Sequence, residues 1–245
     1  MGLRAAIVAG GRGERMRPAT DATPKPMLPL LGKPLLEHQL GWLKRSGIDD
    51  VFLCLGYKAE AVQEHFGDGS RWGMKLRYSV ESSPRGTAGA VKDLGDRGGA
   101  DLLVVYGDLF ISMDVGRLAA FHASKPGAAT LVVWDTDHPQ DSDLAEVTDG
   151  RVTRFYRAGP GEPAGGLALA AVWLVRPSLL ELVPADRPSD FGRDVFPAAL
   201  KAGLVLNAYK TGETVEDVGT FERMERFTRK WERRMGGGGR QHDHL

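Results

Sequence analysis

The chain has 245 residues, of which 42% are hydrophobic and 26% charged, so it can bury a substantial core as one large α/β domain or two small ones. Its 32 basic and 32 acidic side chains give a net charge of zero, which favours neither nucleic acid nor an anionic membrane as a partner. A single cysteine, Cys54, excludes a disulfide within the chain and disfavours a cysteine-based metal site. The sequence contains no run of about 18 apolar residues, so we predict no membrane-spanning helix. We therefore expect a cytoplasmic protein with Cys54 in its core.

The first thirty residues combine a short strand with a glycine-rich, basic loop. The apolar run from Ala5 to Ala9 is bounded by glycines and too short for a helix, so it predicts a buried strand. Three glycines and four cations follow it, namely Gly10, Gly11, Arg12, Gly13, Arg15, Arg17 and Lys25. Glycines bring bare N–H groups close to a ligand, and such groups together with guanidinium and ammonium groups suit phosphate oxygens. A glycine-rich turn with a solvated basic face would explain the glycines alone, but the whole block favours a phosphate site.

The rest of the first half alternates strands and helices. We predict helices within 32–47 and over 59–66 and 87–94, and strands over 51–55, 75–80 and 101–106. This order indicates parallel βαβ units, hence a Rossmann-like three-layer α/β/α fold with a mostly parallel mixed sheet. Ligands of such sheets bind at the carboxyl ends of the strands, where the Gly10 loop and Asp108 both fall.

The second half is less regular. A strong type I′ turn signal at Asp149-Gly150 predicts a hairpin within 146–155. The other predicted elements are helices over 115–123, 177–183, 194–201 and 221–234, strands over 128–134, 167–175 and 204–208, a loop over 158–166 and a flexible tail over 236–245.

The run Gly10-Gly-Arg-Gly-Glu-Arg-Met-Arg-Pro, followed by Pro24-Lys-Pro, resembles the signature of the nucleotidyltransferases that join a nucleoside triphosphate to a sugar 1-phosphate. Met16 and Ala19 depart from the family pattern Gly-Gly-x-Gly-x-Arg-Leu-x-Pro-Leu-Thr. The resemblance implies the nucleotide-diphospho-sugar transferase fold as a single catalytic domain over 1–235. Its nucleotide-binding half would cover about 1–112 and its sugar-binding half about 113–235.

The same resemblance implies roles for the N-terminal residues. The loop Ala9, Gly10, Gly11 and Gly13 would wrap the triphosphate. Arg15 would polarise the phosphates, and Lys25 would stabilise charge at the α-phosphate, so both are expected to be catalytic.

Two aspartates are the candidate ligands of Mg²⁺, which takes oxygen ligands and needs one or two carboxylates. Asp108 follows a strand in Val104-Val-Tyr-Gly-Asp, where it could also form a turn or cap a helix. Its Gly-Asp pair resembles the family's metal-binding aspartate. Asp217 stands in a run similar to the family's Trp-x-Asp-Ile-Gly-Thr-Pro-Glu, with Val215 and Phe221 at the tryptophan and proline positions; helix capping is its alternative role.

The base is expected to bind at Glu81, Gly86 and Thr87, because Glu81-Ser-Ser-Pro-Arg-Gly-Thr-Ala-Gly resembles the family's base-binding segment. Glu81 occupies the position that reads the base edge. A carboxylate accepts hydrogen bonds and donates none, and guanine offers two adjacent donors, so Glu81 favours GTP. A solvated glutamate at a strand end is the alternative, and some uridylyltransferases of this kind also tolerate an acid.

The sugar side departs most from the family. Ala158 aligns with the lysine that usually grips the sugar phosphate, so we predict Arg157 as the substitute. Residues 189–197 resemble the family's Ser-x-Glu-x-Asp-x-Phe-Pro and place Asp190 in the sugar pocket.

The substrates implied are thus a nucleoside triphosphate, with GTP favoured, and a mannose- or heptose-like sugar 1-phosphate, with Mg²⁺ as cofactor and a homo-oligomer possible. Uridylyl transfer to an amino-sugar 1-phosphate is one alternative. A non-catalytic nucleotide-sugar-binding regulatory subunit is another, which the loss of the sugar-phosphate lysine suggests.

Overall fold

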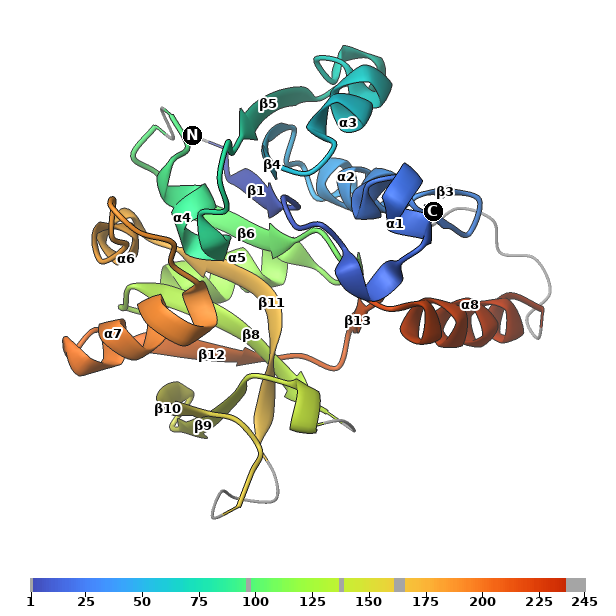
Figure 1. Cartoon of the computed structure of the whole chain (residues 1–245). Helices are drawn as coiled ribbons and strands as arrows, with labels where there is room; N and C mark the ends of the chain where they lie inside the picture. Colours follow the sequence, from blue (N-terminus) through green and yellow to red (C-terminus); the bar gives the residue numbers. More distant parts are fainter. Residues whose placement is uncertain (1, 96–97, 137–138, 161–165, 237–245) are drawn as a thin grey trace.

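The computed structural model describes residues 2–95, 98–136, 139–160 and 166–236 (Figure 1). Within these ranges the strands are β1 (Arg4–Val8), β2 (Pro29–Leu30), β3 (Lys33–Pro34), β4 (Asp50–Leu55), β5 (Lys75–Val80), β6 (Leu102–Tyr106), β7 (Leu109–Ser112), β8 (Ala129–Asp135), β9 (Leu144–Thr148), β10 (Arg151–Tyr156), β11 (Leu167–Val175), β12 (Leu206–Lys210) and β13 (Thr214–Asp217). The α-helices there are α1 (Ala19–Ala22), α2 (Leu35–Arg45), α3 (Ala59–Phe66), α4 (Gly86–Lys92), α5 (Val115–Ser124), α6 (Pro177–Glu181), α7 (Phe196–Lys201) and α8 (Phe221–Gly236). Short 3₁₀ turns lie at Glu14–Met16, Lys25–Met27, Ser70–Trp72 and Pro139–Asp141, and a π-helical turn lies at Phe191–Val195.

One mixed sheet runs through both halves of the chain, with the strand order β5-β4-β1-β6-β11-β8-β12-β10-β9. Strands β5, β4, β1 and β6 are parallel to one another, as β8 is to β12. Strand β11 runs antiparallel between β6 and β8, and the β9–β10 hairpin closes the far edge. The predicted βαβ units of the first half are therefore confirmed.

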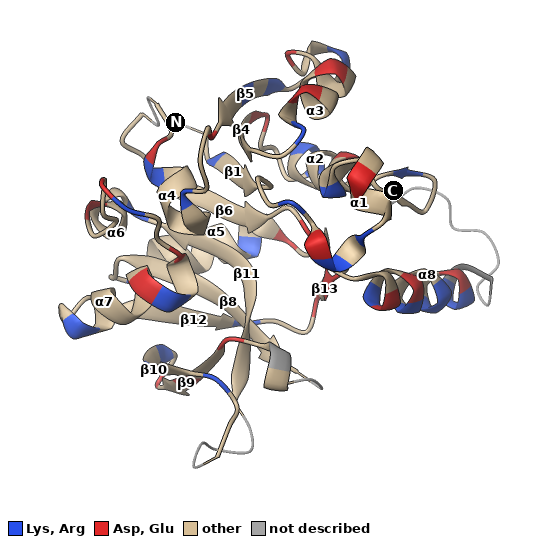
Figure 2. Cartoon of the chain, in the orientation of Figure 1, with Lys and Arg blue, Asp and Glu red and all other residues tan. Residues whose placement is uncertain are grey.

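Helices cover both faces of the sheet, because neighbouring residues of the central strands point to opposite sides and both are apolar. On one side, Ala5 and Ile7 of β1 belong to a core with α2, α3 and α5. On the other side, Ala6 packs in a core with α4, α6 and α7, which also buries Cys54. The predicted three-layer architecture is confirmed, and Figure 2 shows few charged residues on the central strands.

The predicted helices and strands exist, with ends that shift by a few residues. The hairpin turn is of type I′, since Asp149 and Gly150 have φ of 51° and 73°. The helix predicted within 32–47 begins only at Leu35, because Lys33–Pro34 pairs with Pro29–Leu30. Residues 161–165 of the predicted loop and 237–245 of the predicted tail lie outside the described residues.

The sequence did not predict the pairing of β7 with β13, the packing of α8 against that pair, or the π-helical turn. Strands β7 and β13 form a separate antiparallel pair. Helix α8 packs Phe227 against Leu35, Phe110 and Val218, so it covers that pair. The helix predicted over 194–201 begins only at Phe196, because the π-helical turn occupies Phe191–Val195. In the described ranges, no helix is both long and apolar enough to span a lipid bilayer.

Candidate active site

A cavity of about 730 Å³ opens where β1, β4, β5 and β6 end. The loops that follow these strands form its walls, as expected for a sheet of this type. Of the predicted site residues, those that line the cavity are Ala9, Gly10, Gly11, Gly13, Arg15, Lys25, Glu81, Thr87 and Asp108. The predicted residues that do not line it are Gly86, Arg157, Asp190 and Asp217.

The glycine-rich loop has a fixed shape. Gly13 has a left-handed φ of 64°, and a Cβ there would lie 2.8 Å from Thr20 Cγ2. The Thr20 hydroxyl donates a hydrogen bond to the Gly13 carbonyl at 3.0 Å. Met16, at the family's leucine position, is fully buried at the end of the 3₁₀ turn Glu14–Met16. The loop is therefore held in place by its own packing and presents Arg15 at the cavity.

Glu81 lies at the end of the cavity formed by β4 and β5. Its Oε2 accepts the backbone N–H of Arg85 at 2.9 Å. Its Oε1 faces Gly10 and Gly56, where added Cβ atoms would lie 2.8 and 3.0 Å from this oxygen. The two glycines thus make room for the carboxylate. Tyr57, which the sequence patterns did not single out, lines the same end, 5.9 Å from the Arg12 guanidinium.

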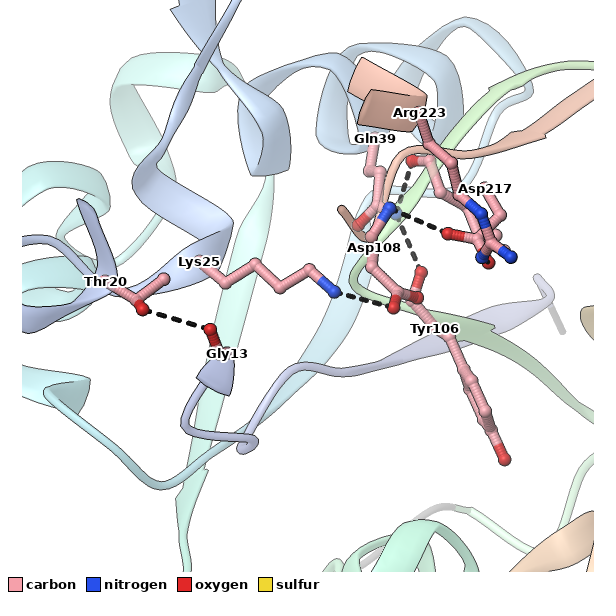
Figure 3. A network of polar contacts seen from close by, with 10 residues as sticks. Gly13, Thr20, Lys25, Gln39, Tyr106, Asp108, Asp217 and Arg223 are labelled. Atoms are coloured by element: carbon pink, nitrogen blue, oxygen red, sulfur yellow. Dashed lines mark hydrogen bonds and ion pairs between the residues drawn. The ribbon is translucent and has the colours of Figure 1, made fainter. Parts of the chain in front are cut away.

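Lys25 and Asp108 also line the cavity, and the Lys25 side chain extends to the Asp108 carboxylate (Figure 3). Its ammonium group donates to Asp108 Oδ2 at 2.8 Å, and the lysine side chain is only 13% exposed. Gln39 of α2 fixes the turn that carries Asp108. Its amide donates to the carbonyls of Tyr106 and Leu109, both at 2.8 Å. Gln39 could have been suspected from the sequence, because it is a polar residue on the apolar face of a predicted helix.

Asp217 is brought to Asp108 by the pairing of β13 with β7, in which Asp217 lies opposite Leu109. The Val218 N–H donates to the Asp108 carbonyl at 3.0 Å, which locks the two segments together. The cap of α8 is Thr220, whose hydroxyl accepts the Arg223 N–H at 3.3 Å. Helix capping therefore does not explain Asp217, and Figure 3 shows its carboxylate beside Asp108.

The charged groups meet around Gly219, which lacks a side chain. A Cβ at this residue would lie 2.7 Å from Asp217 Oδ1, 2.9 Å from Asp108 Oδ2 and 2.9 Å from Lys25 Nζ. One oxygen of Asp217 and one of Asp108 thus lie close to the same point, and the Lys25 ammonium group lies beside it. Among the described residues no cluster of three or more His, Cys, Asp or Glu side chains could hold a metal. An Asp pair fits Mg²⁺, which keeps several waters and is bound through one or two carboxylates plus substrate phosphates.

Beyond Thr87 lies a second charged group at the start of the π-helical turn. Asp190 Oδ1 accepts both the N–H and the hydroxyl of Thr87 at 3.1 Å, and its Oδ2 pairs with Arg193. Burial raises the pKa of Asp190, but the bonds from Thr87 and Arg193 outweigh burial and hold that pKa below its usual value. The π-helical turn Phe191–Val195 lies within residues 189–197, the segment that resembles the family's sugar-binding run.

The remaining predicted residues have other partners in the structure. Gly86 has φ of 73°, and a Cβ there would lie 2.6 Å from the Ser189 carbonyl oxygen, so this glycine is required by packing. The Arg157 guanidinium binds Asp143 Oδ1 at 2.7 Å. A sugar role for Arg157 or Asp190, and a base contact for Gly86, remain predictions.

The sequence profile of the nucleotidyl transferase family matches residues 4–234. The chain belongs to this family. The chain is 31% identical to mannose-1-phosphate guanylyltransferase of Mycobacterium tuberculosis, over 89% of this chain and 61% of that protein. It is also 31% identical to N-acetylmuramate alpha-1-phosphate uridylyltransferase of Neisseria meningitidis serogroup B, over 91% of this chain and 96% of that protein.

Among solved structures, HddC from Yersinia pseudotuberculosis superposes with a TM-score of 0.78 at 23% identity, over 94% of this chain and all of that one. This likeness shows that the two chains share a fold. The chain spans about three fifths of the length of the Mycobacterium relative.

Proposed function

We propose that this nucleotidyl transferase moves a nucleoside monophosphate from a nucleoside triphosphate to a sugar 1-phosphate, releasing pyrophosphate and forming a nucleoside-diphosphate sugar. GTP is the favoured donor and a mannose- or heptose-like 1-phosphate the favoured acceptor. The observation that carries this proposal is the meeting of Lys25, Asp108 and Asp217 around Gly219, at the end of a cavity lined by the glycine-rich loop.

The reaction must bring two anions together, so its catalysis is chiefly positioning and neutralisation of charge. Arg15 and the N–H groups of the loop would hold the triphosphate. Lys25 would stabilise the charge that develops at the α-phosphate, an interaction whose removal commonly costs about 10²- to 10³-fold in rate. Asp108 and Asp217 would hold Mg²⁺, which supplies further positive charge at the phosphates.

The preference for GTP rests on Glu81. Its carboxylate lies in the cavity wall and accepts hydrogen bonds only, which complements the two adjacent donors of guanine. Oε2 already accepts the Arg85 N–H, so Oε1 would accept one guanine donor and the remaining acceptor position of Oε2 the other.

Uridylyl transfer to an amino-sugar 1-phosphate is the second candidate. It is favoured by the Neisseria relative, which the chain matches over almost its entire length and whose name specifies a uridylyltransferase. An acidic residue at position 81 is compatible with either base.

A pyrophosphate-release screen tests the proposal. Five nucleoside triphosphates are combined with a panel of mannose, heptose, glucose and amino-sugar 1-phosphates in the presence of Mg²⁺. We expect release with at least one pair, highest with GTP. Release that is highest with UTP and an amino-sugar 1-phosphate selects the second candidate, and no release with any pair leaves the regulatory-subunit alternative.

A further inference from the structure

We propose that Arg223 sets the cation preference of this site by holding one oxygen of Asp217, so that the carboxylate can offer only its other oxygen to a metal. The inference rests on the proposed function, because it takes Asp108 and Asp217 as the metal-binding pair. Arg223 is thereby a positioning residue, since it acts through Asp217.

The two oxygens of Asp217 have different surroundings. Oδ2 forms an ion pair with Arg223 Nη1. Oδ1 accepts the Gly219 N–H at 2.7 Å and faces the point around which Asp108 Oδ2 and Lys25 Nζ also lie. Arg223 is held firmly, because its side chain is only 14% exposed. The carboxylate thus turns one oxygen to the site and the other to the helix (Figure 3).

The position of Arg223 in α8 is explained by its ion pair with Asp217 and not by helix stability. It is the third residue of the helix, after the Thr220 cap. Helix N-termini carry partial positive charge, and glutamate or glutamine is the favoured residue at this position. An arginine there is disfavoured by the helix itself, and the carboxylate of Asp217 compensates for it.

Two other basic residues of α8, Arg229 and Lys230, have partners outside this site. Arg229 is 62% exposed and lies 3.8 Å from Glu225 on the same helix. Lys230 pairs with Glu216 of β13, which is not among the residues that line the cavity. Figure 2 shows α8 lined with charges of both signs, so a single surface arginine can be exchanged there as a control.

The chemistry of the two common hard cations gives this arrangement a consequence. Mg²⁺ demands a near-ideal octahedron and takes few protein oxygens, whereas Ca²⁺ accepts more ligands and often binds both oxygens of one carboxylate. With Oδ2 held by Arg223, Asp217 can bind a cation through Oδ1 alone. That restriction disfavours Ca²⁺ and leaves Mg²⁺ unaffected.

The test compares Arg223→Met, Arg223→Lys and the control Arg229→Met with the wild-type chain. Bound Mn²⁺ is followed by electron paramagnetic resonance without nucleotide, while Mg²⁺ or Ca²⁺ is added to displace it. The readout is the ratio of the two displacing concentrations. Loss of one positive charge acts on both divalent ions alike, so this ratio isolates the binding mode of Asp217.

We expect Arg223→Met to make Ca²⁺ more effective relative to Mg²⁺ by at least about fivefold, because both Asp217 oxygens become available. Arg223→Lys, which keeps a cation for Oδ2, and Arg229→Met should keep the wild-type ratio. An unchanged ratio in folded Arg223→Met, or an equal change in Arg229→Met, overturns the inference. Wild-type protein that binds no Mn²⁺ also overturns it, whereas failure of the proposed function would appear separately, as absence of pyrophosphate release from wild type.

Discussion

Replacing Gly219 by alanine puts a methyl group where Lys25, Asp108 and Asp217 meet. Gly219 does not have a positive φ, so its backbone accepts alanine without strain. The perturbation is therefore steric and local. It acts on the position of the three charged groups and leaves their identities unchanged.

The contacts set the size of the effect. The added Cβ would lie 2.7 Å from Asp217 Oδ1 and 2.9 Å from both Asp108 Oδ2 and Lys25 Nζ, whereas an ordinary contact begins at 3.4 Å. Relieving these contacts requires shifts of roughly 0.5–0.7 Å, and a misplacement of about 1 Å can lower an enzymatic rate about 100-fold. We expect pyrophosphate release to fall by roughly 10- to 100-fold, which equals about 1.4–2.7 kcal/mol in the barrier.

The assay is Mg²⁺-dependent pyrophosphate release, measured beside the thermal unfolding of each variant. Gly212→Ala is the matched control, because Gly212 also lacks a positive φ and a Cβ there meets nothing within 4 Å. It should keep wild-type activity. Full activity of Gly219→Ala, or a loss shared with Gly212→Ala, would refute the assignment of this point as the reacting centre.

Three further predictions concern the same site and the core. Asp108→Asn and Asp217→Asn should each abolish Mg²⁺-dependent pyrophosphate release while circular dichroism stays native; full activity in either contradicts its role as a metal ligand. Glu81→Gln should lower kcat/KM for GTP relative to UTP, and an unchanged ratio removes the guanine argument. Burial, reinforced by the Arg176 guanidinium, lowers the pKa of His122 below 6.5, so the folded state favours the neutral ring. The free energy of unfolding that this group contributes is fully present above about pH 6.5 and is lost as pH falls through the lowered pKa. Between pH 7.5 and 5.5, the unfolding free energy of His122→Gln, measured by urea denaturation, should therefore fall less than that of wild type. Equal falls in the two proteins refute the prediction.

Much of the site could be predicted because its parts lie directly after strands. The Gly10 loop follows β1 and Asp108 follows β6, and parallel strands bring their carboxyl ends to one edge. Short-range patterns also located Asp149-Gly150, since a type I′ turn depends on two adjacent residues. In these places local sequence and global fold agree.

What could not be predicted depends on distant parts of the chain. Strands β7 and β13 are short and far apart in sequence, so nothing local indicates that Asp217 lies opposite Leu109. Gly219 has an ordinary backbone, and only the assembled site shows why a side chain would not fit there. The π-helical turn that carries Arg193 interrupts the predicted helix, and no periodicity of the sequence reveals such a turn.

The pairing of β13 with β7 also determines when the site can exist during synthesis. Chains emerge from the ribosome amino-terminus first, and the segments that emerge first can fold first. The glycine-rich loop, Lys25 and Asp108 are made early, but β13 is the last strand in the described part of the chain and Arg223 follows it in α8. A nascent chain therefore holds its phosphate-binding loop well before its second carboxylate arrives. Under the proposed function, triphosphate turnover begins only after β13 has been synthesised and has paired with β7.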